Sequence, residues 1–544
     1  MRALLPTWSE WKPAFRAPGT DLMSGLIVAL VALPLALGFG ISSGLGAAAG
    51  LATAIVAGAL AAVFGGSRFQ VSGPTGAMTV VLVPIVHEHG ASGVLTVGLM
   101  AGVLLMALAF AGVGRAVRFM PAPVIEGFTA GIAVVIALQQ VPGALGVAGA
   151  EGEKVWQSAF DAVRRFAEHP DATAPVTALV VAAAILIGGR FLPKLPFALV
   201  AVVVATVVAS VFDLPLTRIG AIPAGLPTPS LDFVQWGTLS GLLLPALAVA
   251  ALAALESLLS ATAADAMAVG TRHDPDRELF GQGLANIAAP LFGGVPATGA
   301  IARTAVNVRS GARTRLAALF HAVVLAAIVY LASGPVADIP IAALAGVLLA
   351  TTVRMVEAAS LAAIARASRG DAIVMALTFL VTVAFDLVTA VVAGIGIALV
   401  LAVRAVAREA SMQQVPLDEA DHLGEEHDLL RDHIVAYRID GPLFFAAAHR
   451  FLLELSEVAD VRVVILRMSR VTALDTTGAL VLADAVRKLQ HRHITVLMSG
   501  LRDDHRARLA TMGALPAGGD DAVFPDTGTA ISYARRFLPT HRAH

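Results

Sequence analysis

The chain has 544 residues, of which 57% are hydrophobic and only 14% charged, and its mean hydropathy is +0.80. Soluble globular proteins have about 45–50% apolar and about 25% charged residues, so the composition excludes a soluble enzyme, a disordered chain and a nucleic-acid-binding protein. The net charge of −1 excludes a strong overall electrostatic field. The absence of cysteine excludes a disulfide framework and thiolate metal sites. We therefore expect an α-helical polytopic membrane protein.

Residues 1–20 form a predicted cytoplasmic N-terminal segment. The segment carries basic residues and lacks the short apolar core and small-residue cleavage site of a secretory signal. Tryptophan concentrates at membrane interfaces, so Trp8 and Trp11 predict that the segment lies against the membrane surface.

Apolar stretches then follow one another through a predicted transmembrane domain over 21–408. We predict fourteen spans, seven in each half. They are 22–40, 44–64, 75–86, 93–113, 122–141, 174–189 and 196–212, then 238–261, 279–292, 299–308, 314–333, 338–358, 371–386 and 388–406. Two of them, 75–86 and 299–308, are too short to cross ~30 Å of hydrocarbon at 1.5 Å per residue.

The basic residues predict the orientation. If the N-terminus lies inside, the connections after even-numbered spans carry most of the arginines, among them Arg115, Arg272 and Arg404, and the short outward connections are nearly free of them. Lys and Arg favour the cytoplasmic side, so an even number of spans with both termini in the cytoplasm is predicted. The long outer loop, about 143–172, is predicted to be a solvated connection.

The composition changes sharply after Arg408. Residues 409–430, rich in Asp, Glu and His, are a predicted linker. In 431–544, short β-branched runs alternate with helical patterns, which predicts a small α/β domain. The predicted strands are 434–439, 461–466 and 494–499, and the predicted helices are 477–490 and 503–511.

The two short spans begin with similar sequences. Ser72–Ala77 and Val295–Ala300 both end in Thr-Gly-Ala, and Phe-Gly-Gly precedes each, at 64–66 and 292–294. Short Gly/Pro-interrupted segments at matching places in two halves point to a midplane transport site. A half-helix that begins inside the membrane has unpaired N–H groups and roughly half a positive charge at its start, so two such starts predict an anion pocket. The alternative is that these residues merely kink ordinary membrane helices.

Glu256 lies inside the apolar stretch 249–260. A carboxylate at bilayer depth is costly unless it is protonated, paired or hydrated, which makes Glu256 a candidate proton carrier. The alternative is a structural ion pair with an arginine. Aligning Pro74 with Pro296 places Pro34 opposite Glu256, and Pro34 is expected to break the first span and free backbone groups that line the cavity.

Two further polar residues lie in the predicted spans. Arg303 is one turn into the second short span, where it either holds positive potential at the site, which we favour, or points to the cytoplasmic surface. His321 is predicted to be a hydrogen-bonded packing residue rather than a proton relay.

Three stretches resemble a known family. They are Gly65–Thr75, Glu256–Leu259 and Gly281–Val308, and they are similar to the sulfate permease (SulP) family of anion transporters, bacterial branch. The resemblance implies a 7+7 inverted repeat of fourteen spans with core and gate regions, two half-helices that meet mid-membrane, and an elevator-like movement of the core. It also implies a cytoplasmic STAS domain over 431–544, a homodimer and a location in the bacterial inner membrane.

The same resemblance implies the site residues. It places the anion at Pro34, Leu35, Thr75, Gly76, Ala77, Ala300, Ile301, Ala302 and Arg303. Glu256 matches an acidic position associated with cation coupling, with Ser257 and Ser260 as neighbouring oxygen donors. Some sodium-dependent bicarbonate carriers have an oxygen-bearing residue where this chain has Ile301, so H⁺ is favoured over Na⁺ as the coupling ion. No other cofactor is expected.

The substrate stays open at this point. Sulfate, bicarbonate and C4-dicarboxylates are all oxyanions that half-helix starts can bind. A secondary-active transporter is favoured; a sodium-coupled bicarbonate symporter, an uncoupled anion channel or exchanger, and a nucleobase symporter on a related fold are alternatives. A membrane enzyme is the weakest alternative, because no metal cluster, phosphate loop or nucleophile–base pair is evident.

Thr476 lies in Asp475–Gly478, which matches the place where related soluble regulators carry Asp-Ser-Ser-Gly with a phosphorylated serine. Thr476 is therefore a candidate phosphate acceptor. The alternative, which we favour, is that Asp475 or Thr476 simply caps the following helix.

Overall fold

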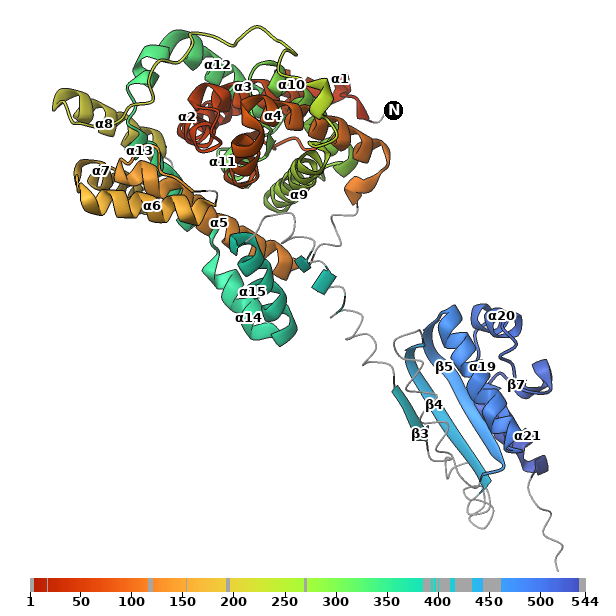
Figure 1. Ribbon diagram of the computed structural model, residues 1–544. Helices are drawn as coiled ribbons and strands as arrows, with labels where there is room; N and C mark the ends of the chain where they lie inside the picture. Colours follow the sequence, from red (N-terminus) through yellow and green to blue (C-terminus); the bar gives the residue numbers. More distant parts are fainter. Residues whose placement is uncertain are drawn as a thin grey trace, which may run out of the picture. The chain divides into compact units, whose positions relative to one another are not determined.

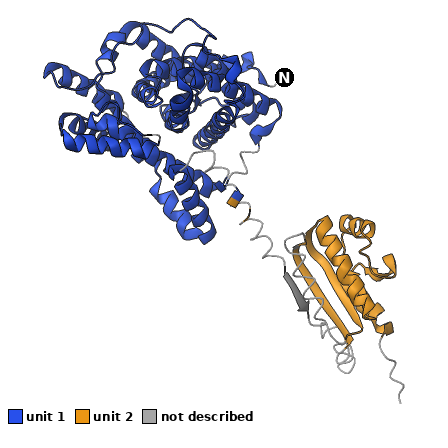
Figure 2. Cartoon of the chain, in the orientation of Figure 1, with its two compact units in different colours: residues 1–396 blue, residues 397–544 orange. Residues whose placement is uncertain are grey.

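The structure is a computed structural model with two compact units, Met1–Gly396 and Ile397–His544 (Figure 2). It describes residues 4–384, 393–394, 396–397, 400, 411–415, 433–443 and 461–537, apart from 17, 116–120, 153, 192–195 and 269–271. Each unit is considered by itself.

The first unit is helical. Its first seven helices after the short α1 (Trp8–Arg16) are α2 (Pro18–Ser42), α3 (Ala47–Phe64), α4 (Gly76–Phe110), α5 (Ala122–Leu145), α6 (Val155–Glu168), α7 (Thr173–Phe191) and α8 (Phe197–Val211). The remaining helices are α9 (Leu243–Met267), α10 (Pro275–Leu291), α11 (Ile301–Arg309), α12 (Leu316–Ala337), α13 (Ile341–Met355), α14 (Ala358–Ala367) and α15 (Arg369–Ala384). By length and composition, eight helical stretches among the described residues can span a membrane.

The helices form two groups (Figure 1). In one group, α10 packs against α3 and α4, α12 against α2 and α3, and α9 against α4 and α11. In the other, α5 packs against α6, α13 and α15, and α7 against α8 and α13. The groups touch where α13 and α8 meet α2 and where α5 meets α4.

Small residues let the helices approach closely. A side chain on Gly50 of α3 would lie 2.0 Å from the carbonyl oxygen of Ala36 in α2, and one on Gly102 of α4 would lie 2.8 Å from the carbonyl of Gly283 in α10. Inside a membrane, helices associate through such van der Waals packing rather than through the hydrophobic effect. These glycines therefore hold together the helices that surround the two short spans.

Every predicted span as far as 371–386 overlaps one of these helices, and most of 388–406 lies outside the described residues. Two spans, 75–86 and 93–113, are parts of the single element α4, which turns at Gly90 (φ 65°, ψ −172°). The number of fourteen spans remains a prediction.

One expectation about this unit is incomplete and one is wrong. The outer loop, 143–172, contains the helix α6, in which only Ala159 and Ala162 are buried. Pro34 does not break the first span: α2 stays helical through it. A proline removes one backbone hydrogen bond, and packed neighbouring helices make that loss tolerable in membrane helices.

The second unit contains a five-stranded sheet in the order β3-β4-β5-β6-β7. The strands are β3 (Ser411–Val415), β4 (Ile434–Leu443), β5 (Val463–Leu474), β6 (Thr495–Ser499) and β7 (Val523–Phe524). All are parallel except β3, which pairs antiparallel with β4. The helices α19 (Thr476–His491), α20 (Asp503–Thr511) and α21 (Thr527–Ala534) accompany them, so the predicted α/β domain is present.

Alternate residues of β5 fill two cores. Val464 and Leu466 pack with α19, whereas Val463 and Ile465 pack with residues of α21. Helices thus cover both faces, as parallel sheets require. The predicted linker, 409–430, needs one correction: residues 411–415 pair with β4 and belong to the sheet. The rest of that linker lies outside the described residues.

Candidate functional site

Two short strands bring the repeated motifs together. β1 (Ser72–Gly73) pairs antiparallel with β2 (Thr298–Gly299), and the Ala300 N–H donates a 2.9 Å hydrogen bond to the Val71 carbonyl. Each strand leads into a helix start: Thr75 is the N-cap of α4 and Ala300 the N-cap of α11. Both half-helix starts, with their unpaired N–H groups and positive dipole ends, therefore meet at this strand pair.

Glu256 of α9 is joined to the start of α4 and to strand β2. Its Oε2 accepts hydrogen bonds from the hydroxyls of Thr75, at 2.9 Å, and Thr298, at 2.7 Å. The two hydroxyl oxygens lie 3.0 Å apart, and Thr75 Oγ1 also accepts from the Met78 N–H. One carboxylate thus sits at the helix start of α4 and on the strand that precedes α11.

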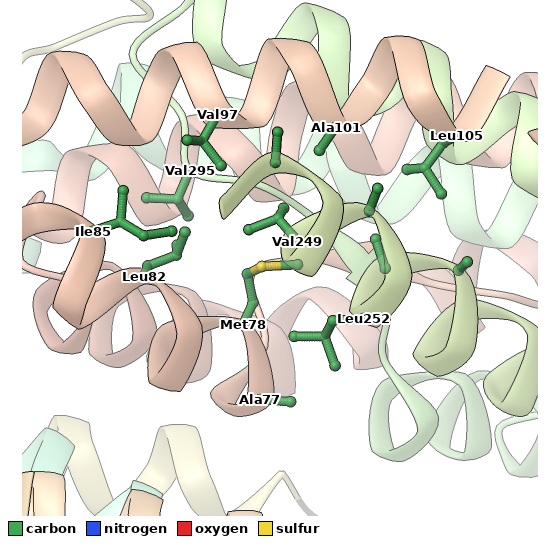
Figure 3. Close-up of a cluster of buried hydrophobic side chains, with 14 of the residues drawn as sticks. Ala77, Met78, Leu82, Ile85, Val97, Ala101, Leu105, Val249, Leu252 and Val295 are labelled. Carbon is green, nitrogen blue, oxygen red and sulfur yellow. The ribbon is translucent and has the colours of Figure 1, made fainter. Parts of the chain in front are cut away.

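An apolar cluster fixes this carboxylate relative to α4. Ala77, Met78 and Leu82 of α4 pack against Val249 and Leu252 of α9 (Figure 3). On a helix, residues four apart share a face, so Leu252 packs one turn before the carboxylate. Because Ala77 points into this cluster, only its backbone can contribute to an anion site.

Ser257 and Ser260 are fully buried, and their hydroxyls form hydrogen bonds with groups other than the Glu256 carboxylate. The Ser257 hydroxyl accepts from the Gly299 N–H at 2.9 Å, and the Ser260 hydroxyl donates to Thr304 Oγ1 at 3.1 Å. These contacts fasten β2 and α11 to α9. Among the described residues, neither serine hydroxyl is hydrogen-bonded to the Glu256 carboxylate.

Arg303 lies inside the protein, not at its surface. It is 1% exposed, and its Nη2 donates to the carbonyl of Pro74. Its Nη1 has no hydrogen-bond partner among the described residues; a side chain on Gly73 would lie 2.6 Å from that nitrogen. The arginine therefore places positive charge next to strand β1. His321 is also fully buried, in α12, as a packing residue would be, but neither of its ring nitrogens makes a hydrogen bond of normal geometry among the described residues, so the predicted hydrogen bond is not found.

The other predicted binding residues differ in exposure. Pro34, Leu35 and Gly76 are buried, and a side chain on Gly76 would lie 2.2 Å from Ile136 Cδ1 of α5. Ile301 is 42% exposed and Ala302 is also exposed. The first two residues of α11 are thus exposed while Arg303 behind them is buried, and the first turn of α4 faces other helices.

The strand pairing corrects the alignment of the two halves. Matching β1 to β2 offsets the halves by 226 residues (298 − 72) and matching the caps Thr75 and Ala300 by 225 (300 − 75), whereas matching the prolines gives 222 (296 − 74). Pro296 precedes its strand, so it is not the counterpart of Pro74. The proposed equivalence of Pro34 and Glu256, which depended on that alignment, loses its basis.

A buried network supports β1 from α10. The Gln282 amide donates to Ser72 Oγ at 2.6 Å and to Glu278 Oε1 at 3.0 Å. Glu278 also accepts from the Gln70 amide, at 2.7 Å, and from the Ser67 N–H, at 2.9 Å. The chain on the approach to the first half-helix is thereby held by hydrogen bonds that satisfy the buried carboxylate.

Sequence reasoning missed Thr298, the second hydroxyl on Glu256. The signal was available, because the dipeptide Thr-Gly occurs in both motifs, at 75–76 and 298–299. It also missed Thr304, whose hydroxyl receives hydrogen bonds from Ser260 and from the Val71 N–H.

In the second unit, Asp475 is the N-cap of α19 and accepts from the Gly478 N–H at 2.6 Å. Thr476, the first helical residue, is exposed. Its modification remains a prediction. Within the parts of the chain that the structure describes, no three His, Asp or Glu side chains form a potential metal site.

Comparisons with known proteins agree with this architecture. The Sulfate permease family matches residues 19–378 and the STAS domain matches residues 430–530. The putative sulfate transporter YvdB of Bacillus subtilis is 35% identical over 505 residues, which cover 91% of this chain and 93% of YvdB. The bicarbonate transporter BicA of Picosynechococcus is 32% identical over 518 residues, covering 91% of each chain.

Solved structures show the same relationship. The transmembrane domain of a cyanobacterium bicarbonate transporter, BicA, has 34% sequence identity and a TM-score of 0.64, and covers 69% of this chain and 98% of its own. The inward-facing structure of the murine Solute Carrier 26 family member A9 has a TM-score of 0.85 at 17% identity. The match covers 98% of this chain and 94% of the murine chain, which shows a shared fold. The chain therefore belongs to the sulfate permease family and carries a STAS domain in its second unit.

Proposed function

We propose that this membrane protein is a secondary-active transporter of a small oxyanion, coupled to protons through Glu256. The observation that carries the proposal is the position of the Glu256 carboxylate, hydrogen-bonded to Thr75 at the start of α4 and to Thr298 beside the start of α11. Two helix starts favour an anion. An ionised Glu256 carboxylate at the same place is stabilised by the positive helix starts and therefore competes with the anion for them.

Coupling follows from this competition. When Glu256 is ionised, its negative charge repels an incoming anion; when it is protonated, the helix starts are left to the substrate. Proton and anion then favour one another's binding, and linkage makes the effect reciprocal. The buried guanidinium of Arg303 adds positive charge that a protonated Glu256 no longer balances. Proton and anion would therefore move together.

The two helix groups supply a route for alternating access. The group that holds both half-helices would act as the core, and the group of α5–α8 and α13–α15 as the gate, in an elevator-type movement. Thr79 of α4 donates a 3.2 Å hydrogen bond to Gln139 of α5, one of the contacts such a movement must break. We further propose fourteen spans, cytoplasmic termini, a homodimer and the bacterial inner membrane as location.

The relatives named above are called sulfate and bicarbonate transporters, which supports an oxyanion without selecting one. C4-dicarboxylates remain a third class, because helix starts bind any carboxylate or oxyanion.

Sodium coupling is the second candidate, and one observation favours it. The Glu256 carboxylate and the hydroxyls of Thr75 and Thr298 form a cluster of three oxygens, and unwound segments of broken helices supply oxygens to coupling ions in other transporters. Ile301 offers no side-chain oxygen. This is why we favour the proton.

Uptake into proteoliposomes tests the proposal. Labelled sulfate, bicarbonate and fumarate are compared under an inward proton gradient, an inward sodium gradient and neither. Accumulation that depends on the proton gradient alone supports the proposal. Dependence on sodium supports the second candidate, and saturable flux that never exceeds equilibrium would point to an uncoupled exchanger or channel.

A further inference from the structure

We propose that α1 is an in-plane membrane anchor that fastens the inner end of the half-helix group to anionic lipid, with Glu10 as the fastening residue. The inference concerns the membrane surface and does not depend on which anion is carried.

One face of α1 is apolar and uncovered. Trp8 and Phe15, seven residues apart, fall on a common side of the helix and are 67% and 63% exposed. Leu5, which precedes the helix, is 49% exposed. The rings of Trp8 and Phe15 stack with centroids 5.7 Å apart. Trp11, which the sequence suggested as a second anchor, is partly buried. The exposed stripe is therefore made by Trp8 and Phe15.

The opposite face is held by the half-helix group. Ala14 is fully buried, and the Glu10 carboxylate bridges two arginines, accepting from Arg277 at 2.7 Å and from Arg315 at 3.1 Å. Burial raises the pKa of Glu10, but the hydrogen bond and charge of Arg277 and the charge of Arg315 outweigh it and lower the pKa to about 2. Glu10 is thus ionised at neutral pH.

The two arginines also cap a helix of that group. Arg315 donates to the carbonyls of Ala62, Gly65 and Ser67 at the end of α3, where the helix leaves its last carbonyls unpaired. Arg277 and Arg315 stand at the starts of α10 and α12. Glu10 therefore attaches α1 to the starts of α10 and α12, and Arg315 extends the connection to the end of α3.

The position of α1 in the chain indicates that lipid covers its apolar face. A single residue separates α1 from α2, a membrane-spanning helix, so α1 lies at the membrane boundary. The exposed apolar side chains continue on α2 at Met23 and Leu26. Lys12 and Arg16 are exposed on α1. An amphipathic helix with basic residues and exposed aromatics binds at the interface of an anionic bilayer.

Fluorescence of Trp8 tests the lipid contact in the full-length protein. The chain has four tryptophans, so replacing Trp11, Trp156 and Trp236 by Phe leaves Trp8 as the reporter. In nanodiscs of phosphatidylcholine and phosphatidylglycerol, lipids brominated on the acyl chain should quench Trp8 strongly, and aqueous acrylamide weakly. Quenching by acrylamide with no effect of the brominated lipid would overturn the lipid contact, because it would place Trp8 in water.

Spin labels test the fastening role separately. The chain has no cysteine, so Lys12→Cys and Arg313→Cys, both at exposed positions, give a single labelled pair between α1 and the start of α12. A narrow distance distribution is expected, and it should broaden in Glu10→Gln but not in the control Glu88→Gln, a carboxylate 74% exposed beside His89. An unchanged distribution in Glu10→Gln would remove Glu10 from this role. Neither experiment measures transport, so a failure here is distinct from a failure of the transport proposal.

Discussion

Thr75 and Glu256 are joined by a 2.9 Å hydrogen bond although 181 residues separate them in the chain. Thr75 caps the first half-helix, and Glu256 belongs to α9, in the second half of the unit. A proton on this carboxylate therefore acts at the place where the helix dipole would attract an anion.

The first prediction concerns Glu256→Gln. The amide keeps the shape of the side chain and still accepts hydrogen bonds from Thr75 and Thr298, but it cannot ionise. We expect uptake driven by a pH gradient to be abolished while the thermal unfolding temperature changes little. Undiminished proton-driven uptake by this variant, in proteoliposomes, would refute its coupling role.

The second prediction concerns Thr298, which donates to Glu256 at 2.7 Å. Thr298→Val removes the hydroxyl, and a hydrogen bond to a charged group contributes about 1.5–3 kcal/mol, equivalent to about one to two pH units. Because the lost donor stabilised the ionised form, the midpoint of the pH–uptake curve should move upward by up to that amount. Thr298→Ser keeps the hydroxyl, so its midpoint should equal that of the unaltered protein. If Thr298→Val and the unaltered protein gave the same pH–uptake curve, the role of this contact would be contradicted.

The third prediction concerns Ala300, the N-cap of α11, which is only 7% exposed. Ala300→Trp should fill the space between the half-helix starts and abolish anion uptake. Since overpacking also destabilises, the unfolding temperature is measured in parallel. Val323→Trp, at a 53% exposed position on α12, is the matched control and should transport normally. Normal substrate affinity in a folded Ala300→Trp protein would place the site elsewhere.

The fourth prediction concerns packing between α2 and α3. A methyl group on Gly50 would lie 2.0 Å from the Ala36 carbonyl and 2.9 Å from Gly40 Cα, and backbone atoms cannot easily move away. Gly50→Ala should therefore destabilise the protein by about 1–3 kcal/mol. Gly334→Ala meets nothing within 4 Å and serves as the control. Thermal unfolding curves compare the two; equal stability would mean that α2 and α3 are less closely packed than described.

The fifth prediction concerns Glu10 and pH. Its pKa falls from 4.5 to about 2 in the folded protein, so the stability it contributes is fully present above about pH 4.5 and is lost as the pH falls through 2. With allowance for solvent screening, that contribution is about 1–2 kcal/mol. Glu10→Gln should thus lower the unfolding temperature at pH 7 and have little effect near pH 2. A difference that is equally large at both pH values would show that the charge is not responsible.

Sequence patterns predicted the helices and the second unit well, because apolar length and β-branched runs are local properties. The strands predicted at 434–439, 461–466 and 494–499 overlap β4, β5 and β6, although β4 and β5 extend to Leu443 and Leu474, beyond the predicted ends. The pattern failed where packing decides: β3 pairs within an acidic stretch that reads as a linker, and Pro34 stays helical inside a packed bundle.

The site was harder to predict than the fold. The repeated motifs pointed to both half-helix starts, and Glu256 stood out as a carboxylate in an apolar stretch. No local pattern states that Thr298 and Thr75 share one carboxylate oxygen, or that Ser260 turns to Thr304 instead. Such contacts depend on how two distant halves pack, although the shared Thr-Gly dipeptide marks both threonines in the sequence.

The most direct test of the central claim is the accumulation ratio of labelled anion in proteoliposomes, inside over outside, with an inward proton gradient and no sodium. For the unaltered protein the ratio should rise above its equilibrium value for at least one of sulfate, bicarbonate and fumarate, and it should fall to that value in Glu256→Gln. An equal ratio in the two proteins, or accumulation driven only by sodium, would contradict proton coupling through Glu256.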